Sequence, residues 1–361
     1  MRKNLLVSLA VSAALAAPLA AHADAGDTTI GGVIYTDMTS ISTTSAGKDV
    51  DPNGIGLDVK RGYFVVNHSF DNVWSANLTT DFNYASYKNS CTVTGGGVGE
   101  TCAVSTSTPE TQLFVKKIYV QGNFDPMLVL KVGSSDMPWI PFAEGVYGYR
   151  FVENTLIDRF GFGNSADWGV NLSGANGMVN YSVSMVNGGG YKNPSRSKSM
   201  DEEGRIAFTP LNGDLIIALG AYSGKRGLDT EAKPAANTAS RQDLLVAWKA
   251  SGLTLGLEYF SADKWNDVTN TGATNKSDGT SVYASYLFPG TDYGVFGRYD
   301  DAKLKKDTDP SLEDKYYNAG FSWKSNKNLT WAVAYKSDKV SDNTGTDIKT
   351  DEFGIWAQIA Y

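Results

Sequence analysis

Histidine and cysteine are almost missing from this chain. Its 361 residues include two histidines, His22 and His68, and two cysteines. Serine and cysteine hydrolases need a histidine beside the nucleophile, and the sequence neighbour of His68 is Ser69. Adjacent strand residues point to opposite faces, so this pair is not a catalytic dyad. The composition predicts that the protein is not an enzyme, and it indicates neither a metal site nor a cofactor.

Long apolar runs and an excess of basic charge are missing as well. Beyond residue 23, no segment approaches the roughly 18 consecutive apolar residues of a transmembrane helix. The net charge is −7, and without Arg2 and Lys3 the chain has 30 basic and 39 acidic residues, a net charge of −9. We therefore do not expect a nucleic-acid partner, because binding to phosphates needs a basic surface.

The N-terminus has the features of a secretory signal peptide. A basic start is followed by an apolar run from Leu5 to Leu19 and by Ala21-His22-Ala23, which fits the small-x-small cleavage pattern. We expect cleavage before Asp24 and export through the periplasm, which leaves residues 24–361 as one domain. A membrane anchor is the alternative, but the run is shorter than the ~20 residues of a spanning helix.

The two cysteines lie close together in the sequence. Cys91 and Cys102 flank residues 92–101, a stretch rich in Gly and Thr that offers little apolar surface to bury. A disulfide between them would suit an oxidising periplasm or cell surface. Two free thiols are the alternative.

The rest of the chain repeats one pattern, in which segments of about ten residues alternate apolar and polar side chains. The alternation is clear in residues 74–84, 168–173, 179–185, 317–324 and 329–336. One face of each segment would contact lipid and the other would face a polar interior. This predicts an all-β protein, a transmembrane antiparallel β-barrel. The alternative, a soluble β-sandwich, would need two or more domains at this length, and no linker divides the chain.

Turn-forming residues and long polar stretches alternate between these segments. The short turns are at 71–72, 125–126, 175–177, 212–214, 251–252, 289–292 and 326–328. The long stretches are 40–55, 89–110, 137–166, 188–201, 225–240, 264–278, 301–314 and 338–349. Seven turns and eight loops predict about sixteen strands, with both chain ends on the short-turn side. Fourteen or eighteen strands are the alternatives.

Aromatic residues support a membrane location. Many lie at segment ends, where rings of Trp and Tyr mark the two membrane interfaces. They are Tyr35, Tyr63, Trp74, Tyr84, Tyr259, Tyr286, Tyr293, Tyr299 and Tyr335. The final residues, 353–361, alternate up to a terminal aromatic, which resembles the C-terminal strand signal of outer-membrane proteins.

Residues 111–174 carry a more specific order of motifs. It runs Lys131-Val132-Gly133, Pro138, Pro141-Phe142, Glu144, Tyr149-Arg150-Phe151-Val152-Glu153 and Asp167-Trp168-Gly169-Val170-Asn171-Leu172-Ser173-Gly174. This order resembles the phosphate-selective porin O/P family and its wider relatives. Arg61-Gly62-Tyr63-Phe64 and Trp74-Ser75 look like the early strand pair of that family. Elsewhere the resemblance is one of architecture.

The resemblance implies a sixteen-stranded barrel, usually trimeric, whose long loop after the fifth strand folds inward and narrows the pore. Here that loop would be residues 137–166. In the family, phosphate selectivity depends on arginine and lysine along the pore. This chain departs from that pattern, since it has only eight arginines after residue 23 and is acidic. We therefore expect the barrel and the inward loop but not phosphate selectivity.

A porin selects solutes by pore width and by charge at the narrowest point. The candidates in the loop are Glu144, Arg150, Glu153, Asp158 and Arg159. The alternative role for the loop charges is to hold the loop through ion pairs of Arg150 with Glu153 and of Arg159 with Asp158. The two roles can coexist.

Basic residues on strands are further candidates for the pore lining. Period-two phasing places Arg61 and Lys131 inside, and also favours Lys117, Arg205 and Arg298 there. A basic side chain that faces lipid at mid-depth would cost about 2–4 kcal/mol, so an inward position is favoured. The alternative is a strand-end side chain that reaches the lipid headgroups.

The function expected from the sequence is passive diffusion of small hydrophilic solutes or ions across the outer membrane of a Gram-negative bacterium. Outer-membrane lipid, lipopolysaccharide and two further copies of the chain, in a homotrimer, are the expected partners. A sugar- or anion-specific channel is one alternative, and Trp356, Tyr283 and Phe296 on the presumed inner face suggest it. A structural or adhesin barrel without an open pore is another. The negative net charge suggests a weak cation preference as a hypothesis.

Overall fold

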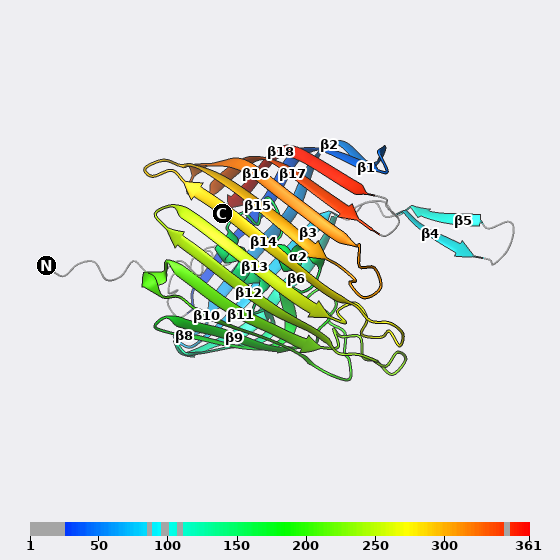
Figure 1. The fold of residues 1–361 in the computed structure, drawn as a ribbon. Coiled ribbons are helices and arrows are strands. Elements are labelled where there is room, and N and C mark those ends of the chain that lie inside the picture. The colour runs from blue at the N-terminus through cyan, green and yellow to red at the C-terminus, as the bar shows by residue number, and fades with distance from the viewer. Residues whose placement is uncertain (1–25, 85–88, 95–100, 107–110, 343–346) are drawn as a thin grey trace.

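A closed antiparallel β-barrel dominates the structure (Figure 1). The computed structural model describes residues 26–84, 89–94, 101–106, 111–342 and 347–361. Within these ranges sixteen strands form the barrel. They are β1 (Thr28–Ser45), β2 (Lys48–Ser69), β3 (Trp74–Tyr84), β6 (Thr111–Asp125), β7 (Leu128–Asp136), β8 (Ala166–Asn176), β9 (Val179–Val186), β10 (Asp201–Phe208), β11 (Leu215–Gly224), β12 (Ala239–Ala250), β13 (Leu253–Asp263), β14 (Lys276–Leu287), β15 (Tyr293–Lys303), β16 (Glu313–Asn326), β17 (Leu329–Ser341) and β18 (Ile348–Ala360).

The ring closes where the two ends of the chain meet. β1 pairs with β2 on one side and with β18 on the other, with Val33 opposite Ala360. The backbones of Gly32 and Tyr361 exchange two hydrogen bonds of 3.0 and 3.1 Å. Closure removes the unpaired strand edges that an open sheet would expose. The predicted all-β antiparallel barrel of about sixteen strands is confirmed.

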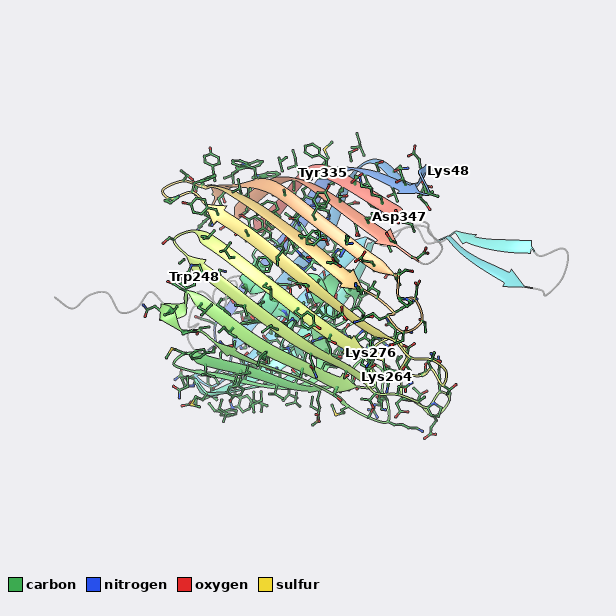
Figure 2. The ribbon with its side chains drawn as sticks, viewed as in Figure 1. Lys48, Trp248, Lys264, Lys276, Tyr335 and Asp347 are labelled. Atoms are coloured by element: carbon green, nitrogen blue, oxygen red, sulfur yellow. The ribbon has the colours of Figure 1, made fainter. Side chains whose placement is uncertain are left out.

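Side chains alternate between an apolar outer face and a polar inner face. On β8, Leu172 points outward, whereas the inward Asn171 is 3% exposed. Asn171 Nδ2 donates to the hydroxyl oxygens of Ser182 and Ser184, at 2.9 and 2.8 Å, which also face inward from β9. Figure 2 shows side chains over the outside of the barrel, Trp248 among them. The face assignments read from the sequence for these strands are confirmed.

The short turns lie where the sequence predicted them, between β2 and β3 and then between alternate strand pairs up to β16 and β17. One predicted loop, residues 40–55, is wrong. Strand β1 continues to Ser45 and β2 begins at Lys48, so only Ala46 and Gly47, both with positive φ, form the turn. This segment is polar but rich in Thr, Ser and Ile, and β-branched residues favour extended backbone. Another predicted loop, 89–110, contains the separate hairpin of β4 (Asn89–Thr94) and β5 (Thr101–Thr106).

Of the aromatic residues predicted at the membrane interfaces, Tyr35 and Tyr63 do not face outward, and the side chain of Tyr84 lies outside the described part of the chain. Trp74, Tyr293 and Tyr335 are exposed on the outside, whereas Tyr35 is 3% exposed and its ring meets that of Tyr63 edge-on. Both follow the inward phase of their strands, Tyr35 with Asp37 and Thr39 on β1 and Tyr63 with Arg61 on β2. Their position near a strand end suggested a membrane interface, but the period of two, which decides the face, turns them inward.

Within the described ranges, the connection between β7 and β8 is the one that contains α-helices. It contains α1 (Ile140–Tyr147), which has a proline in its first turn and ends at Gly148, and α2 (Leu156–Phe160), which ends at Gly161. Both glycines have a positive φ, the conformation that ends a helix and that residues with a side chain rarely adopt. We call residues 137–165 the inner loop. No helix among the described residues is long and apolar enough to cross a membrane.

Candidate functional site inside the barrel

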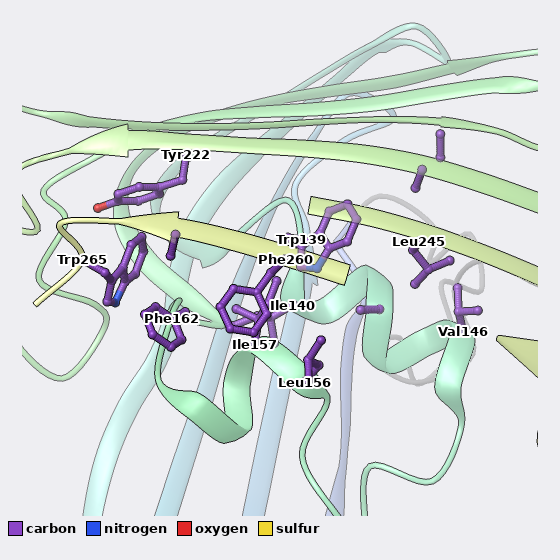
Figure 3. Packing of buried hydrophobic residues seen from close by; sticks show 14 of the residues in the cluster. Trp139, Ile140, Val146, Leu156, Ile157, Phe162, Tyr222, Leu245, Phe260 and Trp265 are labelled. Atoms are coloured by element: carbon purple, nitrogen blue, oxygen red, sulfur yellow. The ribbon is translucent and has the colours of Figure 1, made fainter. Parts of the chain in front are cut away.

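One side of the inner loop packs against apolar side chains of the barrel wall (Figure 3). The loop contributes Trp139, Ile140, Ala143, Val146, Leu156, Ile157 and Phe162. The wall contributes Ile216 and Tyr222 from β11, Leu245 from β12, Phe260 from β13 and Trp265 after it. Apolar side chains such as these would be unfavourable if they faced a water-filled interior. Burying each large one stabilises the fold by about 1.5–3 kcal/mol. This apolar cluster fixes the loop to β10–β13.

Trp139 anchors the start of the inner loop. Its side chain is fully buried, its backbone N–H donates to Glu203 at 2.9 Å, and its indole N–H donates to Glu258 at 3.1 Å. A Cβ atom on Gly220 of β11 would lie 2.4 Å from the Trp139 ring. The wall therefore needs a residue without a side chain opposite this tryptophan.

A second cluster lies further along the loop and is aromatic. Tyr149 stacks on Phe296 of β15 with ring centroids 4.1 Å apart, and Tyr147 meets Tyr283 of β14 at 5.2 Å. Trp356 is fully buried in the same cluster. The three wall aromatics do face inward, but the loop covers them. They therefore serve loop packing, which removes the observation that suggested a sugar channel.

Four cationic wall side chains donate hydrogen bonds to backbone carbonyls of the inner loop. They are Arg205 to Pro138 at 2.8 Å, Lys249 to Val146 at 3.3 Å, Arg298 to Asn154 at 2.5 Å and Arg241 to Phe162. A loop that is only partly helical leaves carbonyls that need donors when they are buried. Arg205 and Arg298 face inward, as their phasing suggested, but they hold the loop.

Arg241 is the most enclosed of these cations. Its side chain is 0% exposed and lies 2.8 Å from a carboxylate oxygen of Asp243 and 3.1 Å from one of Glu203. Its remaining donor reaches the carbonyl of Phe162. A buried charge is tolerated when it is paired and hydrogen-bonded, as here. Sequence reasoning missed Arg241, which lies two residues before Asp243 on the same, inner face of β12.

The five candidate residues of the inner loop are all within it, but their partners differ from the predicted ones. Arg159 lies 2.6 Å from Asp314 and 2.7 Å from Asp338, on β16 and β17, and not beside Asp158. Glu153 lies 3.0 Å from Lys336 of β17. The predicted pairs, Arg150 with Glu153 and Arg159 with Asp158, are wrong. Residues adjacent on a helix point in different directions, so Asp158 cannot serve Arg159.

Arg150 joins the two helices of the inner loop. Its Nε donates to Glu144 of α1 at 2.6 Å, and its Nη2 lies 3.5 Å from Asp158 of α2. All three side chains retain some exposure, at 8–18%. With one guanidinium and two carboxylates, the group carries a net negative charge.

The opposite wall carries the predicted strand cations. Arg61 of β2 lies 3.1 Å from Asp81 of β3, and Lys117 of β6 lies 3.1 Å from Asp136 of β7. Lys131 of β7 is opposite Asn171, which faces inward, and its Nζ lies 5.0 Å from the centroid of the Tyr119 ring. The structure thus places Arg61 and Lys131 inside the barrel. Their part in solute selection stays a prediction.

The pair of Glu153 and Lys336 predicts a pH dependence. Burial alone would raise the pKa of Glu153, but the charges of Lys336, Lys60 and Arg159 lower it below its ordinary value. A lowered pKa stabilises the fold above the unfolded-state value of about 4.3, and this contribution is lost as the pH falls through the folded-state value. Glu153→Gln should lower the free energy of unfolding by about 1–3 kcal/mol at neutral pH.

The thermal midpoints of the wild type and of Glu153→Gln, measured from pH 8 to pH 3, test this prediction. The difference between them should stay constant down to about pH 4.3 and shrink below it. A difference that vanishes near pH 6, or one that persists unchanged to pH 3, would contradict it.

Two further predictions concern residues or side chains that the structure does not describe. Residues 1–25, which include the signal peptide predicted at 1–23, are not among the described residues. Side chains of β4 and β5 are not described either, although their backbone register puts Cys91 opposite Val104 and Cys102 opposite Val93. The cleavage site and the disulfide stay predictions.

The architecture of the barrel defines a class of protein. A closed sixteen-stranded barrel with an apolar outer face and a polar inner face has the fold of outer-membrane porins. No protein-family model and no curated protein matched the sequence. The fold, in contrast, matches solved porin structures over nearly the whole chain.

Three of these structures illustrate the similarity. The outer membrane channel DcaP of Acinetobacter baumannii superposes with a TM-score of 0.64 at 11% identity, over 93% of this chain and 98% of that one. The anion-selective porin from Comamonas acidovorans gives 0.59 at 13%, over 93% and 100%. OmpT of Vibrio cholerae, in its trimer form, gives 0.57 at 13%, over 94% and 100%. At these identities the similarity establishes the fold.

Proposed function

We propose that the protein is a passive diffusion channel for small hydrophilic solutes or ions in the outer membrane of a Gram-negative bacterium. The observation that carries this proposal is the pairing of a lipid-compatible outer face with a polar interior, in a closed barrel of a size that leaves an aqueous channel. The porin fold of its structural neighbours supports it. Nothing in this mechanism requires a reacting centre, so we infer no enzymatic activity.

The inner loop would set the width of the pore. It is fixed to the walls of β10–β18, so the remaining path would run along the inner faces of β2, β3 and β6–β9. On this path, Glu144, Arg150 and Asp158 of the loop would face Arg61 and Lys131 of the wall. Charges at the narrowest point of a channel select among ions. These side chains are therefore the proposed constriction.

Assembly and location are part of the same proposal. One structural neighbour is a trimer, which supports a homotrimer in contact with outer-membrane lipid and lipopolysaccharide. Export would use a signal peptide at residues 1–23, cleaved before Asp24. Mass spectrometry of the protein from outer membranes tests the cleavage site.

Liposome swelling tests whether the barrel is open. Vesicles that contain the folded protein should swell in sugar solutions, at rates that fall smoothly with sugar size and do not saturate with concentration. Vesicles without protein are the control. Folded barrels that admit none of the sugars would overturn the channel and leave the structural or adhesin alternative.

A further inference from the structure

A group of basic and aromatic side chains on the wall opposite the inner loop is unlike the rest of the interior. It comprises Arg61 and Tyr63 of β2, Asp81 of β3, Phe114 and Lys116 of β6, and Tyr191 and Lys192 of the connection between β9 and β10. We call it the lysine-tyrosine cluster. The inner loop approaches it only at Tyr63, which packs against the aromatic cluster that contains Tyr149 and Phe151. Arg61 is the one pore-lining candidate from the sequence that belongs to it.

Positive charge exceeds negative charge in this cluster. Asp81 is the carboxylate at its centre, and it already accepts from Arg61 at 3.1 Å and from the Tyr191 hydroxyl at 2.9 Å. Among the described residues, no carboxylate lies within ion-pair distance of Lys116 or Lys192. Burial lowers the pKa of Lys192, the charges of Arg61 and Lys116 lower it further, and the charge of Asp81 offsets part of this shift. Like charges held together in this way attract an anion.

The two lysines lie against aromatic rings in place of carboxylates. Lys116 Nζ is 4.6 Å from the centroid of the Tyr63 ring and 3.2 Å from its hydroxyl. Lys192 Nζ is 4.3 Å from the centroid of Phe114, and both ammonium groups are 5.8 Å from the centroid of Tyr191. Such contacts stabilise a cation weakly, and they leave ammonium donors free for an anion.

The cluster is open to solvent. Lys192 is exposed, and Tyr63, Phe114, Lys116 and Tyr191 are all half-buried. It lies toward the end of the barrel at which β9 and β10 are joined by residues 187–200, the same end as the other long connections. A solute that enters from that end would meet the cluster near the start of its path.

This arrangement differs from the way in which the barrel handles its other charges. The cations that face the inner loop are paired with buried carboxylates or loop carbonyls, as Arg241 and Arg298 are. Lys117 on the same wall has Asp136. Within the described residues, Lys116 and Lys192 therefore provide positive charge outside any ion pair, with flat apolar surfaces beside it.

We propose that the lysine-tyrosine cluster is a binding site for small aromatic carboxylates, with Lys116 and Lys192 as the carboxylate ligands and Tyr63, Phe114 and Tyr191 as ring contacts. Two ammonium groups bind a carboxylate by charge-assisted hydrogen bonds. A planar ring adds stacking and edge contacts with the neighbouring aromatics. The role of the site in solute uptake rests on the proposed channel function, whereas the binding itself does not.

Calorimetric titration of the folded protein in detergent micelles with benzoate, acetate and inorganic phosphate tests the proposal. Benzoate should bind, and acetate, which lacks the ring, should bind about tenfold more weakly, which corresponds to about 1.4 kcal/mol. Affinity should fall as salt is raised from 50 to 500 mM, because the site is exposed. Absence of benzoate binding would overturn the proposal, whether or not phosphate binds.

Matched variants locate the site. Lys116→Gln and Lys192→Gln should each weaken benzoate binding about tenfold, whereas Lys198→Gln, in the same connection but outside the cluster, should leave it unchanged. Phe114→Leu keeps every charge and should reduce the preference for benzoate over acetate. Equal benzoate affinity in all four variants would overturn the assignment.

The two proposals can fail separately. A barrel that binds benzoate in micelles but admits no sugar into vesicles would refute the channel and keep the binding site. Sugar uptake without any benzoate binding would refute the site and keep the channel.

Discussion

Replacement of Arg241 by leucine should release the inner loop and raise the single-channel conductance. The substitution leaves Asp243 and Glu203 as buried carboxylates without their cation and removes the donor to Phe162. Loss of one partner from a buried ion pair typically costs about 3–5 kcal/mol. The barrel should remain folded, because the backbone hydrogen bonds between its strands are untouched. The lost stability should therefore appear as motion of the inner loop, with larger and noisier current steps.

Two controls accompany this variant. Arg196→Leu removes the same charge from an exposed position and should change neither conductance nor stability. Arg241→Met combined with Asp243→Asn removes both members of the closest pair and should recover part of the stability. Current steps of wild-type size and noise from Arg241→Leu would show that this arginine does not hold the loop in place.

An arginine at Leu172 should strongly impair insertion into lipid. Leu172 is on the outer face of β8, between Leu130 of β7 and Val183 of β9. A basic side chain on the lipid face near mid-depth costs about 2–4 kcal/mol. Ser173→Arg is the matched control, since its side chain faces the interior and should be tolerated.

The fraction of heat-modifiable, folded protein in vesicles, measured against urea concentration, reports this difference. The midpoint for Leu172→Arg should fall well below those of the wild type and Ser173→Arg. If Ser173→Arg were the more damaging substitution, the assignment of faces would be reversed and the barrel would not sit in lipid as described.

The barrel could be predicted because its determinants are local. Each turn is marked by residues such as Asp125-Pro126 or Ser251-Gly252, and each strand shows which face is apolar through a period of two. The prediction failed where local chemistry is ambiguous. The polar β-branched residues of 40–55 were read as a loop, and Tyr35 and Tyr63 were assigned to the membrane interfaces from their position at segment ends, although their phase turns them inward.

The interior could be predicted only in part, because its contacts join distant parts of the chain. Arg241 and the carbonyl of Phe162 are 79 residues apart, and Arg159 and Asp338 are 179 apart. No spacing rule links such positions, so the loop charges were paired with near neighbours. The resemblance to a porin family indicated which loop to examine, but it did not give its partners.

The negative net charge also gives little guidance to ion preference. Many of the carboxylates inside the barrel are used to hold the inner loop, as Asp243, Asp300 and Asp314 are. The lysine-tyrosine cluster, in contrast, has positive charge to spare. Ion preference therefore depends on which charges remain unpaired along the solute path, and the cation preference suggested by composition competes with this cluster.

Single-channel recording of the folded protein in a planar lipid bilayer, across a KCl gradient, shows whether the barrel is an open pore. Stepwise, ohmic currents should appear in groups of three, with a reversal potential that reports the charge preference. A barrel that is demonstrably folded and inserted but carries no current would contradict an open pore.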